Sequence, residues 1–161
     1  MQTTESIFEI LKGVKDPEIP VLTVVDMGVV RRVEWVEDIL EVDITPTYSG
    51  CPAMDVIQRE VEQALEAEGI SNHKVTLVLS PPWTTDWLTA EARKQLEEYG
   101  IAPPVDGTAD KSTLFAKPVE VKCPLCKSED TRLVSQFGST ACKAQYQCNT
   151  CKEPFDYFKC L

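Results

Sequence analysis

The sequence predicts an α+β protein in two parts: a small mixed-sheet α/β sandwich in the order α-β-β-α-β-α, then a short region of strands. Two observations lead to this fold class. Apolar residues recur at helical and strand spacing in the first part, and cysteines recur in close pairs in the second. Three of the eleven prolines fall between the two parts. We therefore expect a domain over residues 1–100, a linker over 101–118 and a second domain over 119–161.

Three helices are predicted from apolar residues spaced three and four positions apart, over residues 4–14, 52–68 and from 89 or 90 to 99. The first helix stops at Asp16-Pro17, because a residue that precedes proline is pushed out of the α region. Pro52 suits the first turn of the second helix, and Gly69 suits the position just after its end.

Three strands are predicted in the same domain, over residues 29–36, 39–45 and 75–79. In the second strand apolar and acidic residues alternate from Leu40 to Ile44, which is the pattern of a strand with one buried face. Glu37 and Asp38 form a tight hairpin turn between the first two strands. We therefore expect the helices to cover a small mixed sheet.

The charge of the chain excludes several classes of partner. Its net charge is −10, and residues 1–103 carry 8 Lys+Arg against 19 Asp+Glu, a net of −11. Nucleic acids and anionic membranes need a basic surface, so we expect neither as a partner. The sequence has no run of 18 apolar residues and no signal peptide at its start. We expect a cytoplasmic protein, in which seven cysteines serve metal or thiol chemistry rather than disulfides.

The strongest pattern is a duplicated CxxC: Cys123 pairs with Cys126 and Cys148 pairs with Cys151, with 21 residues between the pairs. Two such turns supply four thiolates in a closed tetrahedron, which is the geometry of a structural zinc site. Strands are predicted around them over residues 131–137, 143–147 and 155–160. We therefore predict a C-terminal zinc ribbon whose metal supplies much of its stability.

Iron is the alternative metal for such a site. A rubredoxin-like iron site usually has glycine directly after each CxxC, whereas Lys127 and Lys152 stand there. This difference favours zinc over iron.

Cys51 is the candidate reactive residue of the first domain. It lies between Gly50 and Pro52, at the predicted N-cap of the helix, where the helix dipole and unpaired N–H groups lower the pKa of a thiol. Thr47 and Ser49 offer hydroxyl groups in the same loop. A small buried cysteine that only caps the helix explains the position equally well.

Asp16 and Glu18 are the acidic groups that could accompany this thiol. Pro17 and Pro20 stiffen their loop, which could face Cys51. Carboxylates beside a thiolate suit a transient iron or iron–sulfur cluster site. A loop that merely caps helices remains the other interpretation.

The remaining residues give little support for catalysis. Cys142 and Cys160 are expected to pack rather than react, and His73, the only histidine, is expected to be solvated. No motif joins a nucleophile to a base, and no glycine-rich phosphate loop is present. In the loop over 81–87, we expect Trp83 to cover the core and Trp87 to contact a partner protein.

Five segments together resemble one family: DPEIPVLTVVDMG at 16–28, TPTYSGCPA at 45–53, PPWTTDW at 81–87, FGSTACKA at 137–144 and EPFDYFKC at 153–160. The family is the D subunit, J in an older naming, of the bacterial phenylacetyl-CoA epoxidase system, which serves aerobic phenylacetate degradation. Residues 1–100 also resemble small α/β iron–sulfur assembly factors, through the DPE and SGCP segments.

This resemblance implies an accessory role and no catalysis. The epoxidase has a diiron catalytic subunit, a structural subunit and a flavin and iron–sulfur reductase, and the D subunit resembles a factor that matures their metal centres. The assembly-factor motif falls on Asp16, Glu18, Thr47 and Cys51. Structural zinc and a transient iron or iron–sulfur cluster are the implied metals, and the oxygenase and reductase subunits are the implied partners. The alternative is a stoichiometric subunit of the oxygenase that acts by contact alone.

Overall fold

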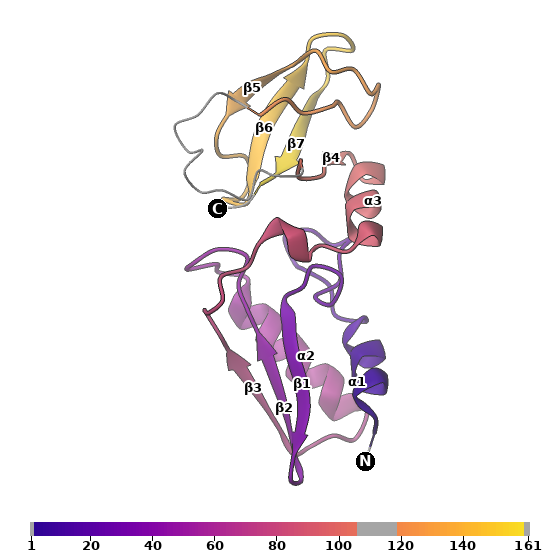
Figure 1. Ribbon diagram of the computed structural model, residues 1–161, viewed down its shortest axis with the longest axis vertical. Coiled ribbons are helices and arrows are strands. Elements are labelled where there is room, and N and C mark those ends of the chain that lie inside the picture. The colour runs from indigo at the N-terminus through magenta and orange to yellow at the C-terminus, as the bar shows by residue number, and fades with distance from the viewer. Residues whose placement is uncertain (1, 106–118, 160–161) are drawn as a thin grey trace. The chain divides into compact units, whose positions relative to one another are not determined.

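The computed structural model describes residues 2–105 and 119–159, which belong to two compact units, 1–83 and 84–161 (Figure 1). The helices and strands follow the predicted α-β-β-α-β-α order and continue into a second sheet. The α+β fold class with a C-terminal ribbon is therefore confirmed.

The first unit is a three-stranded mixed sheet covered by two helices. Its elements are α1 (Thr4–Leu11), β1 (Val30–Val36), β2 (Ile39–Ile44), α2 (Met54–Ala67) and β3 (His73–Leu77). The strand order is β1-β2-β3, with β1 antiparallel to β2 and β3 parallel to it. The parallel pair requires a crossover, which α2 provides.

The helices lie against one face of this sheet (Figure 1). The other face carries the partly exposed side chains of Arg32, Glu41 and Asp43. Buried apolar residues of both layers form the core: Ile7, Leu11, Leu40, Val42, Ile44, Ile57, Val61 and Leu65. On the face away from the helices Arg32 donates hydrogen bonds to Asp43 at 2.7 Å and to Glu41 at 2.8 Å. The alternation predicted for β2 is therefore confirmed on both faces.

The helix α1 ends at Leu11, three residues earlier than its predicted end at Val14. The chain turns at Lys12 and Gly13, and Val14 accepts a hydrogen bond from the backbone N–H of Val24 at 3.0 Å. Val14 is still buried, as the helical spacing predicted. Its burial comes from the loop that follows the helix.

The second unit contains a four-stranded sheet in the order β4-β7-β6-β5. Its elements are the 3-10 helix Thr85–Trp87, α3 (Ala90–Glu98), β4 (Ile101–Ala102), β5 (Thr131–Ser135), β6 (Lys143–Cys148) and β7 (Pro154–Phe158). Strand β4 pairs in parallel with β7, and the other neighbours are antiparallel.

The compact units divide at Trp83, earlier in the chain than the predicted boundary at residue 100. The helix α3 and strand β4 belong with the ribbon, because Ile101 and Ala102 are buried and Ala102 packs in the ribbon's core. The predicted linker over 101–118 therefore begins with a strand, and its residues 106–118 lie outside the described part of the chain.

Trp83 ends the first unit and is 3% exposed. Its indole N–H donates to the backbone carbonyl of Met27 at 2.8 Å, which confirms the expectation that this ring covers the core. Across residues 2–105 and 119–159, no helix is long and apolar enough to cross a membrane.

Candidate metal centre and cysteine loop

The four cysteines of the duplicated CxxC come together in the second unit. Their sulfur atoms all lie within 4.8 Å of one another. The sulfurs of Cys123 and Cys151 are 3.8 Å apart, and those of Cys126 and Cys148 are 3.5 Å apart. Four thiolates at about 2.3 Å from a tetrahedral zinc ion would lie about 3.8 Å apart, so the cluster has the size that this ion requires.

The two cysteine turns repeat the same backbone geometry. In each, the N–H of the first cysteine donates to the carbonyl five residues later: Cys123 to Ser128 at 2.9 Å, and Cys148 to Glu153 at 3.0 Å. The residue directly after each CxxC is left-handed, with φ of 64° at Lys127 and 67° at Lys152. The repeat explains how both turns present two sulfurs to one point.

The lysines after each pair also make equivalent contacts. The ammonium group of Lys127 donates to the carbonyl of Pro124, and that of Lys152 donates to the carbonyl of Asn149. Each carbonyl belongs to the residue that follows the first cysteine of its pair. The lysines therefore close the turns with side-chain contacts that glycine could not make.

The thiols differ in their readiness to ionise. A hydrogen bond from the backbone N–H of Cys151, at 3.4 Å, lowers the pKa of the Cys148 thiol to about 6. Cys151 accepts a bond from the N–H of Glu153, which lowers its pKa, but burial and the three neighbouring thiols raise the pKa to about 12. Four sulfurs this close ionise together only beside a cation, so the arrangement suits a metal ion.

Cys51 lies in the first unit, in the loop that joins β2 to α2. The structure corrects its predicted place, because the N-cap of α2 is Ala53 and the helix begins at Met54. Residues 52–53 form a turn before the helix, and the Met54 N–H reaches the carbonyl of Cys51 at 3.4 Å. The side chain of Cys51 is partly exposed, so it is not the buried capping residue of the alternative interpretation.

The predicted lowering of the Cys51 pKa is also wrong. Burial raises the pKa of this thiol, and the negative charges of Glu18 and Asp16 raise it further. Hydrogen bonds from the N–H of Ala53 and from the Tyr48 side chain act in the opposite direction but are outweighed. The thiol therefore needs a cation or a base to become a thiolate near neutral pH.

The negative charges of Glu18 and Asp16 act on the Cys51 thiol, although burial makes the largest contribution to its raised pKa. Asp16 is 6% exposed, and its Oδ1 accepts the N–H groups of Glu18 and Ile19, each at 2.8 Å. One oxygen of Asp16 thus holds the loop in shape. Asp16 therefore shapes its loop and adds negative charge near the Cys51 thiol.

The other candidate residues have different surroundings. Thr47 is partly buried at the start of the Cys51 loop, and Trp87 is partly exposed in the second unit. Cys142 is 4% exposed and its sulfur lies 3.1 Å from the hydroxyl of Thr140, which agrees with a packing role. Tyr48, which hydrogen-bonds to Cys51, could not be predicted as a site residue, because a tyrosine in a loop carries no spacing pattern that identifies a hydrogen-bond donor.

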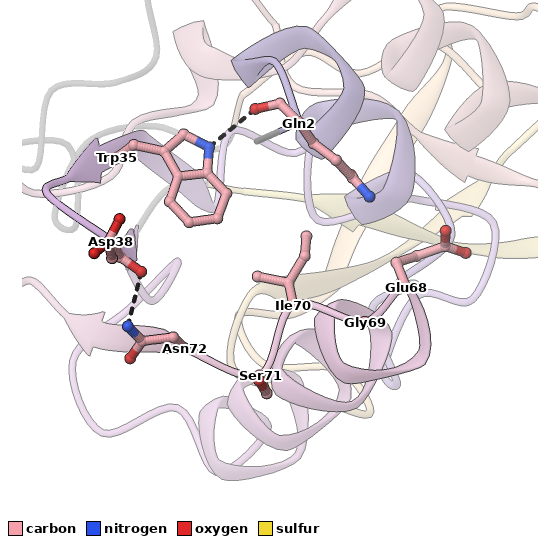
Figure 2. Close-up of a pocket in the computed structure, with 8 residues that line it drawn as sticks. All are labelled: Gln2, Trp35, Asp38, Glu68, Gly69, Ile70, Ser71 and Asn72. Atoms are coloured by element: carbon pink, nitrogen blue, oxygen red, sulfur yellow. Dashed lines mark hydrogen bonds between the residues drawn. The ribbon is translucent and has the colours of Figure 1, made fainter.

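A cavity of about 430 Å³ lies in the first unit, between the β1–β2 hairpin and the residues that follow α2 (Figure 2). It is lined by Gln2, Trp35, Asp38, Glu68, Gly69, Ile70, Ser71 and Asn72. The Trp35 indole donates to the carbonyl of Gln2 at 3.0 Å, and the Asn72 amide donates to that of Asp38 at 2.8 Å. No cysteine or histidine lines this cavity, so it does not extend the thiol site.

Two family models match the chain, one in each part. Residues 4–79 match the model described as iron-sulfur cluster assembly protein, and residues 107–159 match the PaaD zinc beta ribbon domain. Cys51, Asp16 and Glu18 fall within the first match, and the four clustered cysteines fall within the second.

Solved structures and relatives resemble the first part of the chain. A Bacillus anthracis domain of unknown function, DUF59, has a TM-score of 0.54 at 26% identity, over 57% of this chain and 89% of that one. A conserved hypothetical protein from Thermotoga maritima has a TM-score of 0.51 at 32% identity, over 59% of this chain and 94% of that one. An Fe-S protein maturation auxiliary factor from Porphyromonas gingivalis is 37% identical over 60% of this chain and 92% of that protein.

One relative matches nearly the whole chain. An Escherichia coli (strain K12) protein, provisionally named as the D subunit of 1,2-phenylacetyl-CoA epoxidase, is 49% identical over 96% of this chain and 92% of its own length. This match covers both the assembly domain and the ribbon. The chain therefore belongs to the family of the phenylacetyl-CoA epoxidase D subunit, with an iron–sulfur cluster assembly domain followed by a zinc ribbon domain.

Proposed function

We propose that this protein is an accessory component of a phenylacetyl-CoA epoxidase system that delivers iron or an iron–sulfur cluster to another component and does not catalyse epoxidation. The observation that carries the proposal is the partly exposed thiol of Cys51 within reach of the charges of Glu18 and Asp16. This site lies in the part of the chain that matches the iron–sulfur cluster assembly model. Relatives of that part are named Fe-S protein maturation auxiliary factors.

The chemistry of the site supports transfer better than storage. A thiolate and carboxylates can together bind iron, but Cys51 supplies one soft ligand, whereas a resident cluster takes about four cysteine thiolates. The other ligands of the metal cargo would come from solvent, a second molecule or the client. Because the pKa of Cys51 is raised, the thiol holds its proton until a cation displaces it, so binding stays reversible.

The four clustered cysteines have a different proposed role. We infer that they hold one structural zinc ion, because four thiolates leave no position open for a substrate. The ion would stabilise the ribbon by fixing its two cysteine turns, and no step of metal transfer would involve it. The likeness to the PaaD zinc beta ribbon domain supports zinc over iron.

The deciding experiment compares Cys51→Ser with Cys160→Ser, which also removes one thiol. Iron and sulfide are measured in the reductase and in the diiron subunit, each purified from cells that carry one variant. We expect underloaded clients with Cys51→Ser alone, while its zinc content and folding stay normal. The isolated wild-type protein should form no epoxide from phenylacetyl-CoA and an electron donor.

The same experiment tests the rival role. If Cys51→Ser leaves both clients fully loaded, Cys51 is not the transfer ligand. The protein would then act as a stoichiometric subunit by contact alone, and Trp87 would be the first interface residue to substitute. Epoxide formation by the isolated chain would contradict both roles.

A further inference from the structure

Strand β3 is an open edge of the three-stranded sheet. It pairs with β2 on one side, and in the described part of the first unit no strand lies on its other side (Figure 1). Exposed edges readily accept another strand, and proteins usually protect them with charges, proline or a covering element. The stretch from His73 to Leu79 contains neither proline nor an acidic residue. When His73 is neutral, Lys74 is the only charged side chain of this stretch.

Two hydrogen bonds between β2 and the residues that flank β3 identify which backbone groups of β3 face the open side. The N–H of Leu40 donates to the carbonyl of Asn72 at 3.0 Å, and the N–H of Val78 donates to that of Ile44 at 2.8 Å. Backbone groups alternate in direction along a strand, so the even-numbered residues from 72 to 78 bond to β2. Residues 73, 75 and 77 therefore direct their N–H and C=O groups toward the open side, and Leu79 follows two residues beyond the end of the strand.

The side chains of these outward residues form an apolar row. Val75, Leu77 and Leu79 lie on one face because they are two residues apart. Leu77 is 46% exposed and Leu79 is 63% exposed. An added strand would cover this row and at the same time satisfy the outward backbone groups.

Charge indicates which kind of strand fits. The first unit, residues 1–83, carries 6 Lys+Arg and 15 Asp+Glu, a net of −9. A basic partner would be drawn to its acidic surfaces, whereas this edge has no carboxylate in the stretch from 73 to 79. A second copy of the same acidic unit can approach here without placing acid against acid.

We propose that two copies of this protein associate through their β3 edges, which pair antiparallel about a two-fold axis at Leu77. Outward backbone groups at odd-numbered residues allow this register, because a two-fold axis can pass through a hydrogen-bonded pair of identical residues. Leu77 would lie opposite Leu77 of the second copy, and Val75 opposite Leu79 of the second copy. All three apolar side chains of the row would then be covered by one another.

The test is the mass of the full-length, zinc-loaded chain by sedimentation equilibrium across a range of concentrations. The monomer mass is 18.0 kDa, and we expect the wild type to approach twice that mass as concentration rises. Leu77→Lys and Leu79→Lys should each raise the dimer dissociation constant at least tenfold. Leu125→Lys is the matched control, because Leu125 is 58% exposed in the ribbon and should leave the dimer unchanged.

Amide hydrogen exchange tests the register independently. The amides of residues 75 and 77 should gain protection as the wild type dimerises, whereas those of 74 and 76 should be protected at every concentration. A wild type that stays monomeric would overturn the proposal, and so would a dimer that tolerates both leucine substitutions. Leu79→Lys lies beyond the end of β3, so it keeps the test valid if Leu77→Lys does not fold.

Discussion

Lys127 and Lys152 occupy equivalent positions, one after each cysteine pair, and both have a left-handed backbone with φ of 64° and 67°. Glycine would be the unstrained residue at such an angle. Each lysine instead directs its ammonium group to a backbone carbonyl of its own turn. The backbone strain is thus accompanied by a contact that closes the turn around the cysteines.

This relationship predicts a difference between two substitutions of the same lysine. Lys127→Val should destabilise the ribbon by about 1–2 kcal/mol, because a β-branched residue fits poorly at positive φ. Lys127→Gly should cost less, since it relieves the strain while it loses the side-chain contact. Thermal unfolding and the rate of zinc release to a chelator measure both effects. Lys122→Val is the control, because Lys122 is exposed and has no positive φ.

The four clustered cysteines predict one zinc ion per chain. Cys126→Ser and Cys148→Ser should each lose this zinc and unfold the ribbon, because a site without one thiolate no longer closes around the ion. Zinc content by mass spectrometry and backbone nuclear magnetic resonance spectra check the result. Spectra of residues 2–83 should stay unchanged. Retention of full zinc in the double variant would contradict the proposed site.

The raised pKa of Cys51 predicts slow alkylation at neutral pH. The rate with iodoacetamide should rise with pH and reach its plateau at a higher pH than that of an ordinary thiol, because only the thiolate reacts. Mass spectrometry of the peptide that contains Cys51 follows the reaction. A rate that is already maximal at pH 7 would mean that the thiol is fully ionised at that pH, which would contradict a raised pKa.

Removal of the Glu18 charge should make Cys51 more reactive. Glu18→Gln keeps the shape of the side chain and removes a negative charge that raises the Cys51 pKa, so more thiolate forms at pH 7. We expect alkylation to accelerate by about two- to threefold, since the effect of a partly exposed charge is screened. Glu60→Gln, on the exposed part of α2, is the control and should leave the rate unchanged.

Two substitutions of Asp16 separate its structural and electrostatic effects. Asp16→Asn keeps an oxygen that can accept the N–H groups of Glu18 and Ile19, so folding should change little while Cys51 alkylation accelerates. Asp16→Ala removes the acceptor from two buried or half-buried bonds and should cost about 1–3 kcal/mol. Urea unfolding measures the stability of both. Equal stabilities would mean that the loop does not depend on this carboxylate.

The order of elements could be predicted from sequence because apolar spacing is a local property. The alternation from Leu40 to Ile44 and the stripe from Ile57 to Leu65 each identify a buried face without knowledge of the partner element. The clustered cysteines could be predicted for the same reason, since each CxxC is a turn within one short segment. The prediction that the four sulfurs cluster then required one further assumption, that both turns bind the same ion.

Other features depended on contacts between distant segments. The pKa of Cys51 depends on how far the loop buries it and on charges more than thirty positions away, at Asp16 and Glu18. Cys51 lies outside the helix because residues 52–53 form a turn before α2. A proline at position 52 suits such a turn as well as the first turn of a helix, so the sequence alone did not show where α2 begins. Strand β4 is two residues long and has no periodicity of its own, so only its pairing with β7 reveals it.

The pairing of β4 with β7 determines where the gene could be cut. A fragment that starts at residue 119 would contain every cysteine of the metal site yet lack Ile101 and Ala102, which pair with Asp156 and Tyr157. That fragment would present the bare edge of β7 to solvent and would tend to aggregate. A fragment that starts at Thr84 keeps the sheet whole. Exchange of ribbons between homologous genes should therefore be made near codon 84, because a crossover within the stretch that encodes residues 106–118 would pair β4 of one homologue with β7 of the other.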